Sequence, residues 1–143
     1  PIHEKCDRVI LFVIIFYTIF SFLISLSREI IKDLEDLEGD KIQNSNNLVI
    51  NLGIVKSRNI VTFINSFLFI IIIVWQYFQI SSHNGIWGSD NLSILYTFFI
   101  QILLFILIVK SSKSTTKKEF HFISQFIKFI MIIGILSIPI FTY

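Results

Sequence analysis

The sequence predicts an all-α membrane protein, a polytopic bundle of about four transmembrane helices. Only 15% of its 143 residues are charged and 54% are hydrophobic, whereas soluble domains carry about 25% charged residues. The charges are also gathered in a few short segments, which leaves four long apolar runs between them. Inside a bilayer the backbone polar groups must be satisfied within the protein, so continuous apolar runs of this length indicate helices.

Each of the four apolar runs is long enough to cross a bilayer. The runs cover residues 9–26, 60–80, 92–109 and 120–141, and about 20 helical residues span a hydrocarbon core of about 30 Å. With the residues that flank them, they predict helices at about 9–32, 59–80, 92–110 and 120–141, in a single transmembrane domain over residues 1–143. The amides inside these runs are expected to form hydrogen bonds between helices: Asn65, Gln76 and Gln101.

The basic residues predict how the helices are oriented in the membrane. The segments at 27–59 and 110–119 carry five and four Lys or Arg residues, whereas the segment at 81–91 carries none. Two helices separate the basic segments, so both lie on the same side, which the positive-inside rule assigns to the cytoplasm. We therefore predict an integral protein of the cell inner membrane. The net charge of +2 is too small to indicate nucleic-acid binding.

An acidic stripe follows the first apolar run. Residues 27–41, SREIIKDLEDLEGDK, continue that run without a break in helical pattern. Asp33, Asp36 and Asp40 are spaced i, i+3 and i+7, which places them within about 60° on one helix face, and Glu29 joins them one turn earlier. Like charges this close destabilise a helix. A cation should offset them, and Mg²⁺ is the natural candidate because it binds carboxylates together with phosphates and water.

Other interpretations of the acidic stripe remain open at this point. It is also what the solvated end of a membrane helix looks like, with acidic and basic residues alternating just outside the bilayer. A docking surface on a non-catalytic scaffold and a cation site in a small transporter are two further alternatives. The single cysteine excludes an internal disulfide and a cysteine-based metal site, and the three histidines are not spaced as a ligand pair.

The segment REIIKDLEDLEGDK at 28–41 resembles the second aspartate-rich motif of the UbiA superfamily of intramembrane prenyltransferases. The closest resemblance is to the geranylgeranylglycerol-phosphate geranylgeranyltransferase-like branch. Downstream, residues 47–50 and Gly53 stand where the family has T-L-P and a glycine, although Asn47 and Val49 replace the threonine and proline. The family has about nine transmembrane helices and two such motifs, and the first motif is missing from this sequence. The resemblance therefore implies the C-terminal half of the nine-helix fold, a fragment of a larger prenyltransferase domain.

The resemblance also implies a function. It implies transfer of a prenyl group from a prenyl diphosphate to an acceptor, such as a geranylgeranylglycerol-phosphate-like lipid or a quinone precursor, with Mg²⁺ as cofactor. The expected partners are these substrates, membrane lipids and the missing N-terminal half, with no nucleic acid. Without that half the isolated chain is expected to be inactive, and a truncated half-enzyme acting as a membrane scaffold is the alternative. The catalytic and Mg²⁺-binding residues would be Asp33, Asp36 and Asp40. The residues contacting the diphosphate would be Arg28, Lys32 and Lys41.

Overall fold

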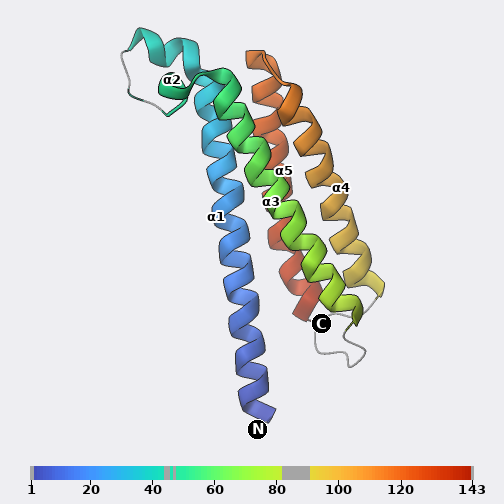
Figure 1. Cartoon of the computed structure of the whole chain (residues 1–143). Helices are drawn as coiled ribbons and strands as arrows, with labels where there is room; N and C mark the ends of the chain where they lie inside the picture. The colour runs from blue at the N-terminus through green and yellow to red at the C-terminus, as the bar shows by residue number, and fades with distance from the viewer. Residues whose placement is uncertain (1, 44–45, 47, 82–90, 143) are drawn as a thin grey trace.

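The computed structural model is helical over nearly all of the chain that it describes (Figure 1). It describes the backbone of residues 2–43, 46, 48–81 and 91–142, and the side chains of residues 10–43, 46, 48–78, 80–81 and 91–137. In chain order the helices are α1 (Ile2–Ile42), α2 (Leu48–Leu52), α3 (Ile54–Ser81), α4 (Asn91–Lys113) and α5 (Lys117–Thr142). The described residues contain no β-strand, so the predicted all-α fold class is confirmed.

Four of these helices are long and apolar enough to cross a membrane, namely α1, α3, α4 and α5. They extend beyond the apolar runs that predicted them: α1 continues to Ile42 rather than to about residue 32, and α3 begins at Ile54 rather than at about residue 59. Polar residues at a membrane edge can continue a helix, because the backbone bonds remain intact while the side chains reach water. The acidic segment is thus part of the first membrane helix. The short helix α2 was not predicted.

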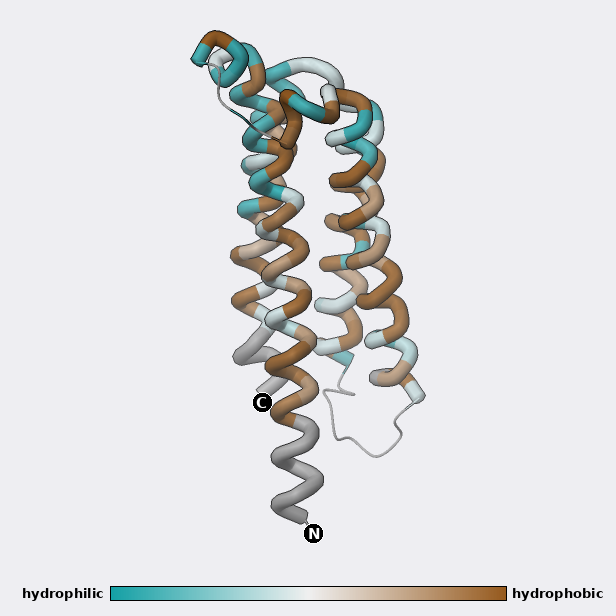
Figure 2. Tube along the Cα trace, turned by 60° about the vertical axis from the view of Figure 1, so that its left-hand side comes forward, coloured by the Kyte–Doolittle hydropathy of each residue, from teal (hydrophilic) through white to brown (hydrophobic). Residues whose placement is uncertain are grey.

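The four long helices alternate in direction and form a closed ring of neighbours (Figure 1). In the described part of the chain, α1 packs against α3 and α5, and α4 packs against the same two helices from the other side. The short α2 packs on α1 and α3. Figure 2 shows hydrophilic residues gathered at the end of the bundle that carries α2, and apolar residues along the rest. The two basic segments therefore lie at one end, as predicted.

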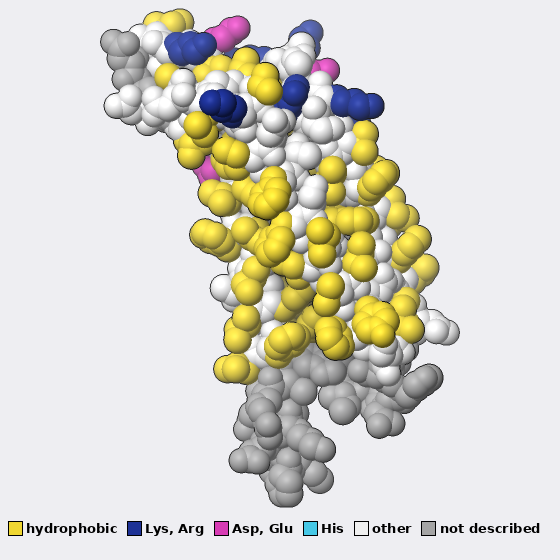
Figure 3. Space-filling model, viewed as in Figure 1, with side chains coloured by type: hydrophobic (Ala, Val, Ile, Leu, Met, Phe, Trp, Pro, Cys, Tyr) yellow, Lys and Arg dark blue, Asp and Glu magenta, His cyan; other side chains and the backbone are white. Residues whose placement is uncertain are grey.

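The core of the bundle is aliphatic, and it includes the fully buried side chains of Ile31, Leu68, Leu104 and Ile127. Many large apolar side chains lie on the outside instead (Figure 3), as is expected where the surrounding medium is lipid. The helices contribute unequally to the core. In the most apolar 18-residue stretch of α1 only 11% is buried inside the bundle, against 44% for α5. This apolar stretch of α1 thus presents most of its surface outward.

Polar side chains link the helices within this core. Gln101 Nε2 donates a hydrogen bond of 2.6 Å to Gln76 Oε1, which joins α4 to α3. Ser27 Oγ donates to Asn65 Oδ1 at 3.3 Å, which joins α1 to α3. The prediction that these three amides form bonds between helices is confirmed. In a membrane interior such bonds contribute about 0.6 kcal/mol on average.

The hydrophilic end of the bundle is held by two local devices. Gly53 adopts a left-handed conformation (φ 81°) between α2 and α3, which is a conformation that glycine adopts without steric cost. At the start of α5, the Glu119 carboxylate accepts hydrogen bonds from the backbone N–H groups of Thr115 (2.7 Å) and Thr116 (3.0 Å). The Thr116 hydroxyl accepts one from the Glu119 N–H in return (3.4 Å). This reciprocal arrangement is a capping box, which fixes the first turn of the helix.

Candidate functional site

The acidic stripe lies on one face of the last turns of α1. The residues that face the bundle in this segment are apolar, with Ile31 and Leu34 buried, whereas the Asp36 side chain is 50% exposed. Residues 10–42 of α1 are about 50 Å long at 1.5 Å per residue, well beyond a hydrocarbon core of about 30 Å. The helix can therefore cross the apolar layer with its first half and carry the carboxylates at the boundary.

The carboxylates of the stripe act on one another. The Asp33 side chain is partly buried and interacts electrostatically with Asp40, Glu29 and Asp36. The field at this face is thus negative, and a divalent cation would relieve the repulsion. Within the described residues, however, no group of three or more Asp, Glu, His or Cys side chains converges on one point. The carboxylates of the stripe lie along one helix face and do not surround a common point. Their role as metal ligands therefore stays a prediction.

The basic residues predicted for the diphosphate lie around this stripe in different ways. Lys32 Nζ lies 3.9 Å from Asp36 Oδ2, one helical turn away, and both side chains are about half exposed. Arg28 Nη1 lies 3.3 Å from Glu29 Oε1, while its buried Nε has no hydrogen-bond partner in the described structure. Lys41 is exposed in the last turn of α1. The structure thus brings Lys32 next to an acidic residue of the stripe, and Lys41 follows Asp40 about 100° round the helix.

One polar contact beside the stripe was not predicted. Glu35, on the side of α1 that faces α5, accepts a hydrogen bond at 2.7 Å from the Nδ1 of His121. The donor is the imidazole, because an ionised carboxylate can only accept. The two residues are 86 positions apart in the sequence. No local spacing could have paired them, and only the packing of α5 on α1 brings them together.

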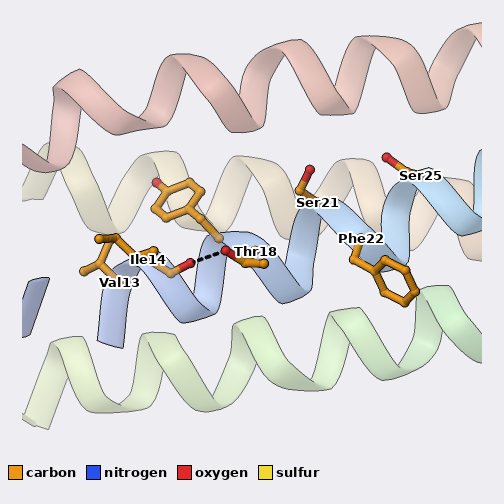
Figure 4. Close-up of a pocket in the computed structure, with 7 residues that line it drawn as sticks. Val13, Ile14, Thr18, Ser21, Phe22 and Ser25 are labelled. Carbon is orange, nitrogen blue, oxygen red and sulfur yellow. Dashed lines mark hydrogen bonds between the residues drawn. The ribbon is translucent and has the colours of Figure 1, made fainter. Parts of the chain in front are cut away.

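A shallow hollow lies on α1 over residues 13–25, on the N-terminal side of the acidic stripe (Figure 4). It has a volume of about 670 Å³ and is lined mainly by apolar side chains together with several hydroxyl groups. Thr18 and Ser25 lie on the helix face of the acidic stripe, because they precede Glu29 by about three turns and one turn. Thr18 Oγ1 donates to the Ile14 carbonyl at 2.7 Å, so its hydroxyl is satisfied within the helix. The face therefore changes from apolar with hydroxyls to acidic along one helix.

Comparison with known proteins relates the chain to an enzyme. Over 122 residues it is 34% identical to a digeranylgeranylglyceryl phosphate synthase from Methanosphaera stadtmanae, a match that covers 82% of this chain and 40% of that protein. No family model and no solved structure matches the chain. The relative is a UbiA-superfamily prenyltransferase, so the resemblance drawn from residues 28–41 is confirmed. This integral membrane chain is therefore a homologue, over four fifths of its length, of the UbiA-superfamily prenyltransferases.

Proposed function

We propose that this chain supplies one aspartate-rich wall of a magnesium-dependent membrane prenyltransferase, which moves a prenyl group from a prenyl diphosphate to a lipid acceptor. The observation that carries the proposal is the order of features along α1, where an apolar, hydroxyl-lined hollow over residues 13–25 precedes the acidic stripe by about one helical turn. A prenyl diphosphate has the same division, with an apolar tail and a highly charged head. Homology to a prenyltransferase supports the proposal independently.

The residues of α1 have separate roles in this proposal. Asp33, Asp36 and Asp40 would hold Mg²⁺, since their oxygen atoms are the donors that Mg²⁺ prefers and their mutual repulsion favours a cation. The bound metal would neutralise the charge that collects on the diphosphate as the bond between carbon and oxygen breaks. Lys32 would bind the same oxygens as a mobile point charge.

Basic residues on either side of the stripe complete the proposed diphosphate contacts. Arg28 has a buried Nε without a partner and would donate from its planar fork, which suits phosphate oxygens. Lys41, exposed at the end of α1, would approach from the water side. The acceptor's hydroxyl oxygen then forms a bond to the prenyl carbon, and the diphosphate leaves with the electron pair of its broken carbon–oxygen bond and with the proton that the hydroxyl loses. Apolar surroundings exclude water that would otherwise capture the prenyl group.

The name of the relative suggests which substrates to test first. That protein is a digeranylgeranylglyceryl phosphate synthase, and a product with two geranylgeranyl groups on one glyceryl phosphate can arise by adding the second group to a lipid that already has one. We therefore propose geranylgeranyl diphosphate as donor and geranylgeranylglyceryl phosphate as acceptor. A quinone precursor is the other acceptor to be compared.

We also propose that the acidic stripe faces the cytoplasm of a cell whose inner membrane holds the protein. Basic side chains gather at the same end of the bundle as the stripe (Figure 3), and basic residues at one end of a helix bundle favour the cytoplasmic side. A water-soluble diphosphate product would then be released into the cytoplasm.

The test is prenyl transfer by the full-length protein in membranes, with labelled geranylgeranyl diphosphate and with Mg²⁺ or EDTA. We expect Asp36→Asn and Asp40→Asn to lower turnover at least ~100-fold, the loss that follows removal of a main electrostatic element. Glu38→Gln is the matched control, because Glu38 is exposed on the same segment but lies on the opposite helix face from the stripe. Full activity in both aspartate variants would remove these residues from the site.

A non-catalytic role is the second candidate, and two observations favour it. The acidic residues of the described chain do not enclose a metal by themselves, and the chain spans 40% of the length of its relative. A membrane scaffold would need neither Mg²⁺ nor prenyl diphosphate. The same assay separates the two candidates, because a scaffold would transfer no prenyl group either with Mg²⁺ or with EDTA.

A further inference from the structure

The seam between α1 and α5 is joined by a polar contact near each end. At the hydrophilic end, His121 Nδ1 lies 2.7 Å from Glu35 Oε1. In the other half of the bundle the Tyr17 hydroxyl lies 2.5 Å from the Ser137 hydroxyl. The contacts are 18 residues apart on α1 (from 17 to 35) and 16 apart on α5 (from 121 to 137). Because the two helices run in opposite directions (Figure 1), these two contacts fix their register.

Glu35 is the immediate neighbour of the acidic stripe. Its side chain is 13% exposed, whereas that of Asp36, the next residue, is 50% exposed. Successive residues point about 100° apart on a helix. Holding Glu35 against α5 therefore sets the direction in which Asp36 points.

The partner of Glu35 stands on a rigid element. His121 lies in the second turn of α5, directly after the turn that the capping box of Thr116 and Glu119 fixes. Its neighbours Phe120 and Ile123 are 2% and 1% exposed, so this part of α5 is anchored in the core. The His121 side chain itself is 59% exposed. Burial of apolar surface therefore does little to hold this side chain in place, and its main contact is the bond to Glu35.

We infer that Glu35 and His121 are positioning residues for the proposed metal site, because their bond holds the aspartate-bearing end of α1 at one rotation and distance from α5. This inference rests on the proposed function. The end of α1 carries several carboxylates that repel one another. Buried Ile31 and Leu34 anchor this segment in the core, and the bond narrows the range of rotations that this packing still allows. Without the bond, part of the free energy of metal binding would be spent on ordering the helix end, which weakens apparent affinity.

This role predicts a particular kinetic change. Removing the bond should raise the apparent KM for Mg²⁺, while saturating Mg²⁺ restores the ordered helix end and therefore kcat. A residue that reacts with the substrate would instead lower kcat at every Mg²⁺ concentration. A residue that only stabilises the fold would lower the amount of folded protein and leave the KM for Mg²⁺ unchanged.

The experiment uses the full-length protein in lipid nanodiscs, with Mg²⁺-dependent prenyl transfer and Mn²⁺ binding by electron paramagnetic resonance measured on the same samples. Glu35→Leu and His121→Phe remove the bond, and His121→Phe changes an exposed side chain that carries little risk for folding. Glu35→Gln keeps an oxygen that accepts from the imidazole. Glu38→Leu is the control for loss of an acidic residue from the same segment.

We expect Glu35→Leu and His121→Phe to raise the KM for Mg²⁺ and the dissociation constant for Mn²⁺ about 10-fold, with kcat within about twofold of the wild type. Glu35→Gln and Glu38→Leu should stay within about twofold for all three quantities. Unchanged metal affinity in both bond-removing variants overturns the inference. So does a loss of kcat without a change in metal affinity, or an equal effect of Glu38→Leu.

The two readouts also separate this inference from the proposed function. If the wild type binds Mn²⁺ with an affinity that depends on the pair but transfers no prenyl group, the proposed function fails and the positioning role stands. If it transfers prenyl groups without binding Mn²⁺ or requiring Mg²⁺, the positioning role and the proposed Mg²⁺ site both fail, while prenyl transfer itself stands. If it does neither, both are overturned.

Discussion

Ser27 and Asn65 form a fully buried hydrogen bond of 3.3 Å between α1 and α3, and both side chains are 0% exposed. Ser27 is the first residue after the apolar run of α1 and precedes the acidic stripe by two residues. The Nδ2 of Asn65 is buried without a partner, so the amide is only partly satisfied. This bond ties the part of α1 just before the acidic stripe to α3.

The partly satisfied amide predicts unequal effects of two substitutions at Asn65. Asn65→Leu removes a hydrogen bond but also an unpaired buried N–H₂ group, so the free energy of unfolding should change by less than about 1 kcal/mol. Asn65→Asp places a carboxylate in the same buried position and should destabilise the bundle by about 3 kcal/mol or more. Thermal unfolding in detergent, followed by circular dichroism, measures both. Equal stability of the two variants would contradict the buried bond.

The Gln76–Gln101 bond of 2.6 Å predicts coupling between α3 and α4. Each single change to Leu leaves one amide without its partner in an apolar bundle and should lower the free energy of unfolding by about 1 kcal/mol. The double variant should lose less than the sum of the two, because no unpaired amide remains. A double-mutant cycle in the same unfolding assay gives the coupling. Simple additivity would mean that the bond contributes nothing.

Two glycines with open space around them should respond oppositely to alanine. No atom lies within 4 Å of the position of an added Cβ at Gly39 or Gly53. Gly39 is inside α1, where alanine should raise the free energy of unfolding by about 0.5–1 kcal/mol. Gly53 has a φ of 81°, so alanine there should lower it by about 1–2 kcal/mol. Unfolding midpoints of the two variants test this difference in sign.

Lys32 should matter for the proposed reaction more than for stability. Its contact with Asp36 is 3.9 Å long between half-exposed side chains, and such pairs contribute about 0–1 kcal/mol. Lys32→Gln should therefore leave the unfolding midpoint nearly unchanged. If Lys32 binds the diphosphate as proposed, the KM for geranylgeranyl diphosphate should rise about 10-fold. Steady-state kinetics of the full-length protein measures this, and Lys118→Gln serves as a control from the same end of the bundle. An unchanged KM would exclude Lys32 from the diphosphate site.

Much of the fold was predictable, because a lipid bilayer allows few backbone conformations. Long apolar runs in a bilayer must form helices, and amides inside those runs need partners, which is why Gln76, Gln101 and Asn65 could be paired with other helices in advance. The spacing of Asp33, Asp36 and Asp40 likewise predicted a common face. Whether these aspartates bind Mg²⁺ stays a prediction.

The features that were missed depend on packing between distant segments. Glu35 and His121 are each unremarkable in their local sequence, and their bond exists only because α5 returns antiparallel to α1. The short helix α2 has five residues, too few for a hydrophobic period to be recognised. The bounds expected for α1 stopped at about residue 32, although the helical pattern continues through residue 41, because charged residues at a membrane edge do not mark where such a helix ends.

No proline or glycine interrupts α1 from Ile10 to Glu38, so the membrane-crossing part and the stripe as far as Asp36 form one stiff helix. When the membrane-crossing half of such a helix tilts, the end that carries the carboxylates moves with it. Membrane helices adjust their tilt to the thickness of the surrounding lipid. A change in lipid thickness that tilts α1 would therefore shift the height at which these carboxylates meet the water, since no proline or glycine lies between to absorb the change.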